Sequence, residues 1–486
     1  MLLMAITSCK KDFLDRRPLG RYTDEEVPAG SFDSRVFSTY SLLRADGFNG
    51  HLYLGIQSYR SDEAEKGSTA TDDAAQESMY DDFQYNKSNG GIQTYWTDHY
   101  ALIISANAII AEIDSLQLSD PNTLINRAEA KFLRAFAYFD LVRAFGQVPK
   151  IDFKIYDPAQ VNKPKASVAD LFALIDADLA EAASVLPVNW EAKYIGRLSK
   201  GAALALRART FLWRSNWAAA LGAAKSVIDL NRYSLVPNFG SQFRHEGENG
   251  PESIFEIQAY FSQTQTNLGL NYARVQGVRG AGSWDLGWGW NTPTDELENE
   301  FEAGDPRKME TLLYMRQIDP LYNVLVDVSS TQFPRLYSNK KVYTSPSDRA
   351  AYNERQGPWM NHRIIRYADV LLMAAEAANE LGGAQNTADA LAWLEMVRAR
   401  ARGTSTTILP RVTTTNQAAL RDAIRHERFV ELAMEEQRFW DLVRWGIDLQ
   451  VLQGIGKAYA VKHRLLPIPQ AEVDKSGGVL IQNPDY

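Results

Sequence analysis

The sequence predicts a mostly α-helical protein with long irregular loops. Apolar residues recur at helical spacing over long segments, and glycine or proline residues end those segments. Two regions, 46–95 and 232–362, lack this periodicity and are rich in glycine and polar residues. The chain has 486 residues, of which 45% are hydrophobic and 23% charged, so it can bury a large core.

The helices follow from the periodicity in chain order. From Thr97 to Leu116 the apolar residues form one stripe, and a second helix from about Thr123 to Phe145 ends at Gly146. The same pattern predicts further helices near 167–185, 197–214, 217–230, 364–381, 387–402 and 417–445.

Several of these helices form pairs with short joints. Leu198–Trp213 and Trp217–Leu230 meet at Ser215 and Asn216, with alanines at the positions where helices pack closely. A unit of about 34 residues with this pattern is similar to a tetratricopeptide (TPR) repeat. Arg366–Arg402 is a second such unit, jointed at Gly382 and Gly383. A generic helical hairpin also explains both units.

The irregular regions are the expected location of function, because binding residues lie disproportionately on loops. Region 232–362 has room for short strands, and one is expected near Ser253–Ala259. Region 46–95 carries the acidic pairs Asp72-Asp73 and Asp81-Asp82. Paired carboxylates suit glycoside hydrolysis or Ca²⁺ binding, but neither an EF-hand spacing nor a strand-end active site is indicated.

A tryptophan cluster is the first candidate binding site. Trp284, Trp288 and Trp290 lie within seven residues, among glycines that leave large rings poorly shielded. Exposed indoles offer flat apolar faces to the C–H side of a sugar ring, with about 2.5 kcal/mol for ~100 Å² covered. The alternative is that these rings fill a core beneath a long loop.

Two further groups are candidates for ligand contact. Tyr95 and Trp96 follow the polar loop at the start of the next helix, where Trp96 could serve as a hydrophobic staple. Arg60 and Asp62 belong to a charged loop segment that could hydrogen-bond sugar hydroxyls. The alternative for Arg60 and Asp62 is a solvated loop or a salt bridge.

Other chemistries are disfavoured. Lys and Arg number 52 and Asp and Glu 60, which leaves a formal charge of −8 without a basic patch, so nucleic acid is not an expected partner. The six histidines are scattered, and nucleotide-binding or nucleophile motifs do not occur. We therefore expect no metal, no cofactor and no enzymatic activity.

The single cysteine, Cys9, excludes an internal disulfide and a Cys-based zinc site. A short apolar stretch from Met1 to Ile6 and two small residues precede it, which resembles a bacterial lipobox. We expect residues 1–9 to be the remnant of a lipoprotein signal, with lipidation at Cys9. A basic first part and the usual apolar length are missing, so we expect the true start to lie upstream. The alternative is a frayed terminus with an incidental cysteine.

Segments along the whole chain resemble one family, the SusD/RagB family of outer-membrane nutrient-binding lipoproteins. They are Cys9 with Asp12–Asp15 and Pro18, Arg127–Phe139, Phe145–Pro149, Gly196–Ala203, Pro293–Leu297, Asp305–Arg307, Arg366–Leu372, Glu427–Arg428, Arg438–Gly446, Pro467–Gln470 and Gln482–Tyr486. Each match is weak alone, but they occur in order.

The resemblance implies a single body over 10–486, with an N-terminal part to about 300 and a C-terminal part from about 300. It implies about four TPR-like helix pairs, with the ligand face on irregular loops. It also implies that the region of Tyr95 and Trp96 contributes an aromatic residue and polar residues to the ligand face. It further implies a lipid-anchored protein on the outer membrane, facing the cell exterior. Its partner would be a SusC-like TonB-dependent transporter, and its cargo an oligosaccharide or other nutrient.

The sequence leaves three hypotheses for the function of the protein. The leading hypothesis is a binding lipoprotein, the second a TPR scaffold for protein partners, and the third a surface hydrolase. A binding protein predicts that Trp284, Trp288 and Trp96 converge on one concave face, whereas a scaffold predicts that they lie in the core.

Overall fold

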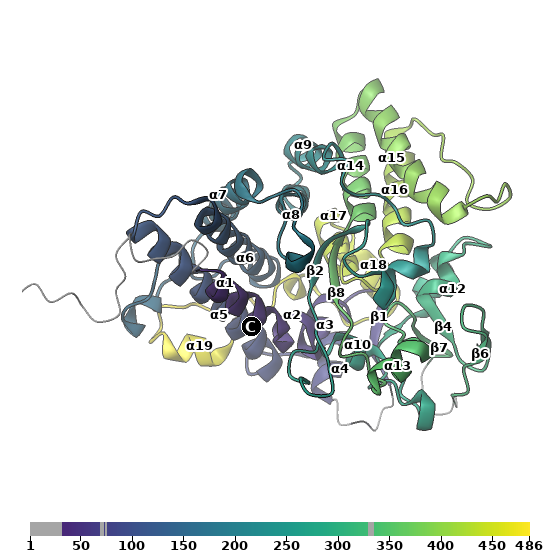
Figure 1. Cartoon of the computed structure of the whole chain (residues 1–486), viewed down its shortest axis with the longest axis horizontal. Coiled ribbons are helices and arrows are strands. Elements are labelled where there is room, and N and C mark those ends of the chain that lie inside the picture. The colour runs from purple at the N-terminus through teal and green to yellow at the C-terminus, as the bar shows by residue number, and fades with distance from the viewer. Residues whose placement is uncertain (1–31, 69–71, 73–74, 329–334) are drawn as a thin grey trace, which may run out of the picture.

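The computed structural model describes residues 32–68, 72, 75–328 and 335–486, and Figure 1 shows a mostly α-helical molecule. The predicted fold class is confirmed. Within the described residues, eight helices match the predicted segments. They are α5 (Gly90–Ser115), α6 (Pro121–Phe145), α7 (Val168–Val185), α8 (Lys200–Trp213), α9 (Trp217–Ile228), α14 (Tyr367–Leu381), α15 (Ala384–Arg402) and α16 (Gln417–Glu431).

These helices pack in a continuous stack. α5 contacts α6, α6 contacts α7, and the series continues through α8, α9 and α14 to α15, while α16 packs on α14 and α15. The two predicted helix pairs, α8 with α9 and α14 with α15, are neighbours in this series. In Figure 1 the stack runs from α5 on the left to α15 at the upper right.

Side-chain caps fix the helix starts. Asp120 caps α6 by accepting a hydrogen bond from the Thr123 amide at 3.0 Å, and Pro121 occupies the first turn. Asn89 caps α5 in the same way, accepting from the Ile92 amide at 3.0 Å. This cap starts α5 seven residues before the predicted boundary, so Trp96 lies inside the helix.

The segment 417–445 differs from its prediction as one helix. α16 ends at Glu431, and a separate helix, α17 (Arg438–Trp445), follows. Met434 and Glu436 between them take positive φ angles of 63° and 58°, which no α-helix accommodates. The Met434 amide donates to Glu63 Oε2 at 3.1 Å, and Tyr272 donates to Glu436 Oε1 at 3.0 Å. Long-range contacts therefore hold this break.

Short elements occupy the two irregular regions. In the described ranges the strands form antiparallel pairs: β1 (Ala64–Gly67) with β3 (Trp290–Pro293), β2 (Ser253–Ile257) with β8 (His362–Arg366), β4 (Leu312–Tyr314) with β7 (Tyr337–Asn339), and β5 (Ile318–Asp319) with β6 (Val324–Leu325). The strand expected near 253–259 is confirmed, but residues 364–366, predicted as helix, belong to β8.

Short helices complete the molecule. They are α1 (Asp33–Ser41), α2 (Asp46–Asn49), α3 (His51–Gln57), α4 (Ala75–Asp81), α10 (Tyr272–Gln276), α11 (Asp295–Glu300), α12 (Arg307–Thr311), α13 (Pro346–Tyr352), α18 (Asp448–Gly454) and α19 (Gln470–Lys475). In Figure 1, α10, α12 and α13 lie with β4, β6 and β7 at the lower right, beside the helical stack. None of the helices in the described ranges has the length and apolar character needed to cross a membrane.

Candidate functional site

Two tryptophans form an accessible aromatic pair beside the helical stack. The rings of Trp288 and Trp290 lie 4.9 Å apart, centroid to centroid, with an angle of 62° between their planes. Both side chains are half-buried, and the imidazole of His51 lies 6.0 Å from the Trp288 ring and 5.9 Å from that of Trp290. We call these three rings the tryptophan platform.

Two stretches far apart in the sequence, 51–67 and 272–293, hold the platform. β1 pairs with β3 so that Gly67 lies opposite Trp290, while α3 begins at His51. The Trp288 amide donates to the Arg274 carbonyl of α10 at 2.9 Å. A Cβ on Gly287 would lie 2.2 Å from that same carbonyl, so only glycine allows this approach. The glycines that suggested exposed rings therefore also bring backbone segments together.

The carboxylate of Asp72 is held in place beside the platform by hydrogen bonds. Its Oδ2 accepts hydrogen bonds from Trp290 Nε1 and from Arg279 Nη1, both at 2.9 Å, and its Oδ1 is bonded to the Lys66 ammonium. Burial raises the pKa of the Asp72 carboxyl, but the hydrogen bonds from Lys66 and Trp290 outweigh it and leave the pKa below its ordinary value. Asp72 therefore stays ionised and orients the Trp290 indole.

His51 is held by two carboxylates. Its Nδ1 lies 2.9 Å from Glu77 Oε1, and its Nε2 lies 3.7 Å from Asp46 Oδ2. Burial lowers the pKa of His51, but its contacts with Glu77 and Asp46 outweigh that effect and raise the pKa above 6.5. The platform therefore has an imidazole that carries a proton more readily than a free histidine.

This geometry predicts a pH-dependent contribution to stability. Because the folded-state pKa of His51 is raised, its ion pairs stabilise the protein fully below pH 6.5 and lose that effect as pH rises through the folded-state pKa. We expect His51→Gln to lower the free energy of unfolding by up to about 1 kcal/mol more at pH 5.5 than at pH 8.5. Urea unfolding of both proteins at the two pH values measures this; an equal or larger effect at pH 8.5 would contradict it.

Trp284 does not belong to the platform. It is 9% exposed and packs in a separate apolar cluster with Val278, Leu286 and Tyr343, with its ring 6.2 Å from that of Tyr343. For this residue the structure agrees with the alternative of core filling. Trp288 and Trp290 also pack against the main apolar core but are only partly buried, so the three tryptophans differ in exposure although their local sequences are alike.

Tyr95, Arg60 and Asp62 are also buried, with partners inside the protein. The Tyr95 hydroxyl accepts a hydrogen bond from Gln57 Nε2 at 2.8 Å. The guanidinium of Arg60 lies 4.0 Å from the Phe439 ring centroid, and Asp62 pairs with Arg438 at 2.7 Å. In this structure they have no surface to offer a ligand, and Asp62 matches the salt-bridge alternative.

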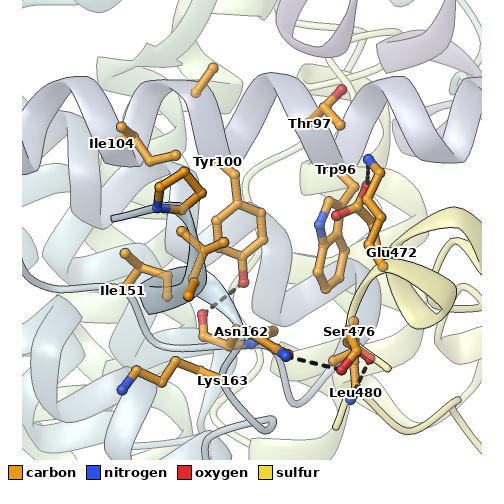
Figure 2. Close-up of a pocket in the computed structure, with 16 residues that line it drawn as sticks. Trp96, Thr97, Tyr100, Ile104, Ile151, Asn162, Lys163, Glu472, Ser476 and Leu480 are labelled. Atoms are coloured by element: carbon orange, nitrogen blue, oxygen red, sulfur yellow. Dashed lines mark hydrogen bonds and ion pairs between the residues drawn. The ribbon is translucent and has the colours of Figure 1, made fainter. Parts of the chain in front are cut away.

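Trp96 lines a different cavity. A pocket of about 640 Å³ lies between α5, the segment 149–163 and the C-terminal part of the chain. Figure 2 shows Trp96, Tyr100 and Ile104 projecting from the same side of α5 toward the segment that holds Asn162. None of the platform residues lines this pocket, and Trp284 does not either. The predicted convergence of Trp96 with Trp284 and Trp288 on one concave face is therefore wrong, as is the staple interpretation of Trp96.

Sequence reasoning missed four residues around the platform: His51, Lys66, Arg274 and Arg279. The scattered histidines and single basic residues give no local signal, because these residues meet the tryptophans only through the fold. Asp72 was considered as a catalytic acid, but it is bonded to Lys66 and Arg279; its neighbour Asp73 lies outside the described residues. No group of three potential metal ligands occurs in the described residues.

Comparison with known proteins identifies the family. Residues 251–464 match the family described as SusD family, and residues 12–212 match the one described as "Starch-binding associating with outer membrane". SusD-like protein P38 of Formosa agariphila is 30% identical over 384 residues, which cover 74% of this chain and 73% of the relative. The chain belongs to the SusD family.

Other SusD-like proteins agree over nearly the full length. SusD-like protein P2 of Formosa agariphila is 27% identical over 508 residues, covering 100% of this chain and 98% of the relative. A solved structure titled "Laminarin binding SusD-like protein" has 26% identity and a TM-score of 0.78, covering 96% of this chain and 100% of its own. The SusD-like, TPR-like fold predicted for this chain is confirmed.

Proposed function

We propose that this SusD-like protein binds a glycan at the cell surface through the tryptophan platform. The observation that carries the proposal is the half-exposed pair Trp288 and Trp290, held by an ionised Asp72 and flanked by His51. Support also comes from the SusD-like protein whose title says that it binds laminarin. Such a protein needs no catalytic group, so we propose binding without hydrolysis.

The energetics favour a site that combines stacking with polar contacts. Two rings that each cover ~100 Å² contribute about 5 kcal/mol gross, whereas association costs at least ~4 kcal/mol. Stacking alone would therefore give only weak binding. The side chains of Asp46, Asn271 and Arg274 reach the surface nearby and can hydrogen-bond sugar hydroxyls.

We further propose a lipid anchor at Cys9 and a location on the outer membrane, facing the cell exterior. Cys9 lies outside the described residues, and the support is its lipobox-like sequence context together with a family description that refers to the outer membrane. The proposed partner is a SusC-like TonB-dependent transporter that takes up the bound oligosaccharide. The division of the body near residue 300 also stays a prediction.

The second candidate is a TPR-type scaffold for protein partners. The burial of Tyr95 and Trp284 favours it, because a scaffold would place its aromatic residues in the core. The platform distinguishes the two functions, since a scaffold does not require half-exposed tryptophans fixed by a buried carboxylate.

Titration calorimetry tests the proposal. The full chain with Cys9→Ser, which cannot be lipidated, would be titrated with plant, fungal and host polysaccharides, and the same mixtures assayed for new reducing ends. We expect heat from one glycan class and no new reducing ends. If none of the polysaccharides produces heat of binding, the scaffold function is favoured. Released reducing ends would overturn the proposal that this protein is not an enzyme.

A further inference from the structure

We infer that the tryptophan platform takes an acidic glycan, one that carries carboxylate or sulfate groups; this inference rests on the proposed function. Three features of the platform carry it: an arginine that has no acidic partner in the described part of the chain, a second arginine that reaches solvent, and acids that are mostly buried.

Arg274 is the first feature. Its side chain is exposed, and its guanidinium carbon lies 5.5 Å from the centroid of the Trp288 ring. Among the described residues, no carboxylate lies within ion-pair distance of it. Its backbone carbonyl accepts the Trp288 amide at 2.9 Å, so the residue cannot leave the ring's neighbourhood. A sugar stacked on Trp288 would bring its substituents toward this guanidinium.

Arg279 is the second feature. Its Nη1 donates to Asp72 Oδ2, the same oxygen that accepts the Trp290 indole N–H, so the guanidinium lies at the edge of the platform. The Arg279 side chain is 43% exposed, whereas that of Asp72 is only 5% exposed. The pair therefore presents cationic N–H groups to solvent, while its carboxylate points into the protein.

The remaining acids do not reverse this balance. The Glu77 side chain is 6% exposed and is bonded to His51. Asp46 is the exception at 38% exposed, but its carboxylate faces His51 at 3.7 Å and accepts from Asn271 Nδ2 at 3.4 Å. Among the described groups that contact the platform, two guanidiniums therefore reach solvent, one of them paired with the buried Asp72, and the one exposed carboxylate, Asp46, already has partners.

This cationic edge is a local property. The chain as a whole has a formal charge of −8, so its net charge does not account for two guanidiniums at the edge of the platform. A guanidinium matches carboxylate and sulfate oxygens with two parallel hydrogen bonds, which a single sugar hydroxyl cannot accept. A ligand that alternates apolar ring faces with anionic groups would therefore satisfy both the indoles and the arginines.

The test uses glycan pairs that differ only in charge. The full chain with Cys9→Ser would be titrated with polygalacturonate and its methyl ester, and with laminarin and sulfated laminarin. Three variants would be compared: Arg274→Gln, Arg274→Lys and Arg411→Gln. Arg411 is an exposed arginine in the segment between α15 and α16 and controls for non-specific attraction of polyanions.

We expect the acidic member of at least one pair to bind at least tenfold tighter, with a preference that shrinks as salt is added. Arg274→Gln should weaken that acidic member two- to fivefold, the range of an exposed ion pair, and weaken its neutral counterpart less, because a glutamine amide can still hydrogen-bond a sugar hydroxyl. Arg274→Lys keeps the charge but loses the paired N–H groups, so its affinity should fall between those of wild type and Arg274→Gln, whereas Arg411→Gln should bind like wild type.

Failure of the inference and failure of the proposed function look different. Neutral glycans that bind as tightly as acidic ones, or an equal loss for both in Arg274→Gln, would overturn the acidic ligand but leave glycan binding standing. Equal losses in Arg274→Gln and Arg411→Gln would mean diffuse attraction and would also overturn it. If none of these four glycans binds, and none of the plant, fungal and host polysaccharides does either, both the inference and the proposed function fail.

Discussion

Glu431→Gln is expected to destabilise the protein by about 3–5 kcal/mol, the cost of leaving buried charges without their counterion. Glu431 on α16 is fully buried and pairs with three arginines from different parts of the chain. Arg366 Nη1 lies 3.1 Å from its Oε1, Arg307 Nη1 lies 3.1 Å from its Oε2, and Arg400 donates to Oε1. A neutral amide would leave these guanidiniums short of one negative charge.

The same carboxylate should make stability depend on pH in the acid range. Burial alone would raise its pKa, but Arg400, Arg366 and Arg307 outweigh burial and lower the pKa of Glu431 from 4.5 to about 2. A lowered folded-state pKa gives stability that is present above about pH 4.5 and is lost as pH falls toward 2. The stability difference between wild type and Glu431→Gln should therefore shrink over that range.

Chemical denaturation at pH 7 and at several values below 4.5 measures both effects. Asp152→Asn is the control, because Asp152 pairs with Lys150 at 3.3 Å on the surface, and its loss should cost less than about 0.5 kcal/mol. A Glu431→Gln protein as stable as Asp152→Asn would contradict a structural role for this network.

The fold was largely predictable because local signals and tertiary packing agree. Helix-length periodicity and capping residues such as Asp120 specify the stack without knowledge of distant contacts. The break between α16 and α17 was not predictable, since Glu63 and Tyr272 hold Met434 and Glu436 from far away in the sequence. The local periodicity alone predicts one continuous helix over this segment.

The candidate site was predictable only in part, for a similar reason. Glycine neighbours pointed to Trp288 and Trp290, but the same context surrounds Trp284, which enters a core with Tyr343. Whether an indole is covered depends on the segment that packs over it, and that segment lies elsewhere in the chain. His51 comes from α3, Arg274 from α10 and Arg279 from the segment after α10, so they reach the tryptophans through tertiary packing, which no local pattern encodes.

Trp288→Ala is expected to lower the affinity for the glycan 50- to 100-fold. Removing a ring face that covers ~100 Å² of sugar loses about 2.5 kcal/mol, and each 1.4 kcal/mol is a factor of ten. Trp288→Phe should restore part of the affinity, because a smaller ring still offers an apolar face. Calorimetry with the glycan identified above measures the change, and thermal unfolding shows whether each variant remains folded.

Tyr156→Ala is the matched control, because Tyr156 is an aromatic residue that is 76% exposed and lies outside the platform. Its removal should leave the affinity unchanged. A similar loss in Trp288→Ala and Tyr156→Ala would indicate diffuse contact with the polysaccharide. If Trp288→Ala and Trp290→Ala both bind like wild type, the glycan binds elsewhere. The next site to test would then be the pocket lined by Trp96 and Tyr100, whose rings line a cavity of about 640 Å³ (Figure 2). The platform is favoured over that pocket because Trp96 is only 4% exposed, whereas both platform indoles are half-buried and so have more ring surface to offer a sugar.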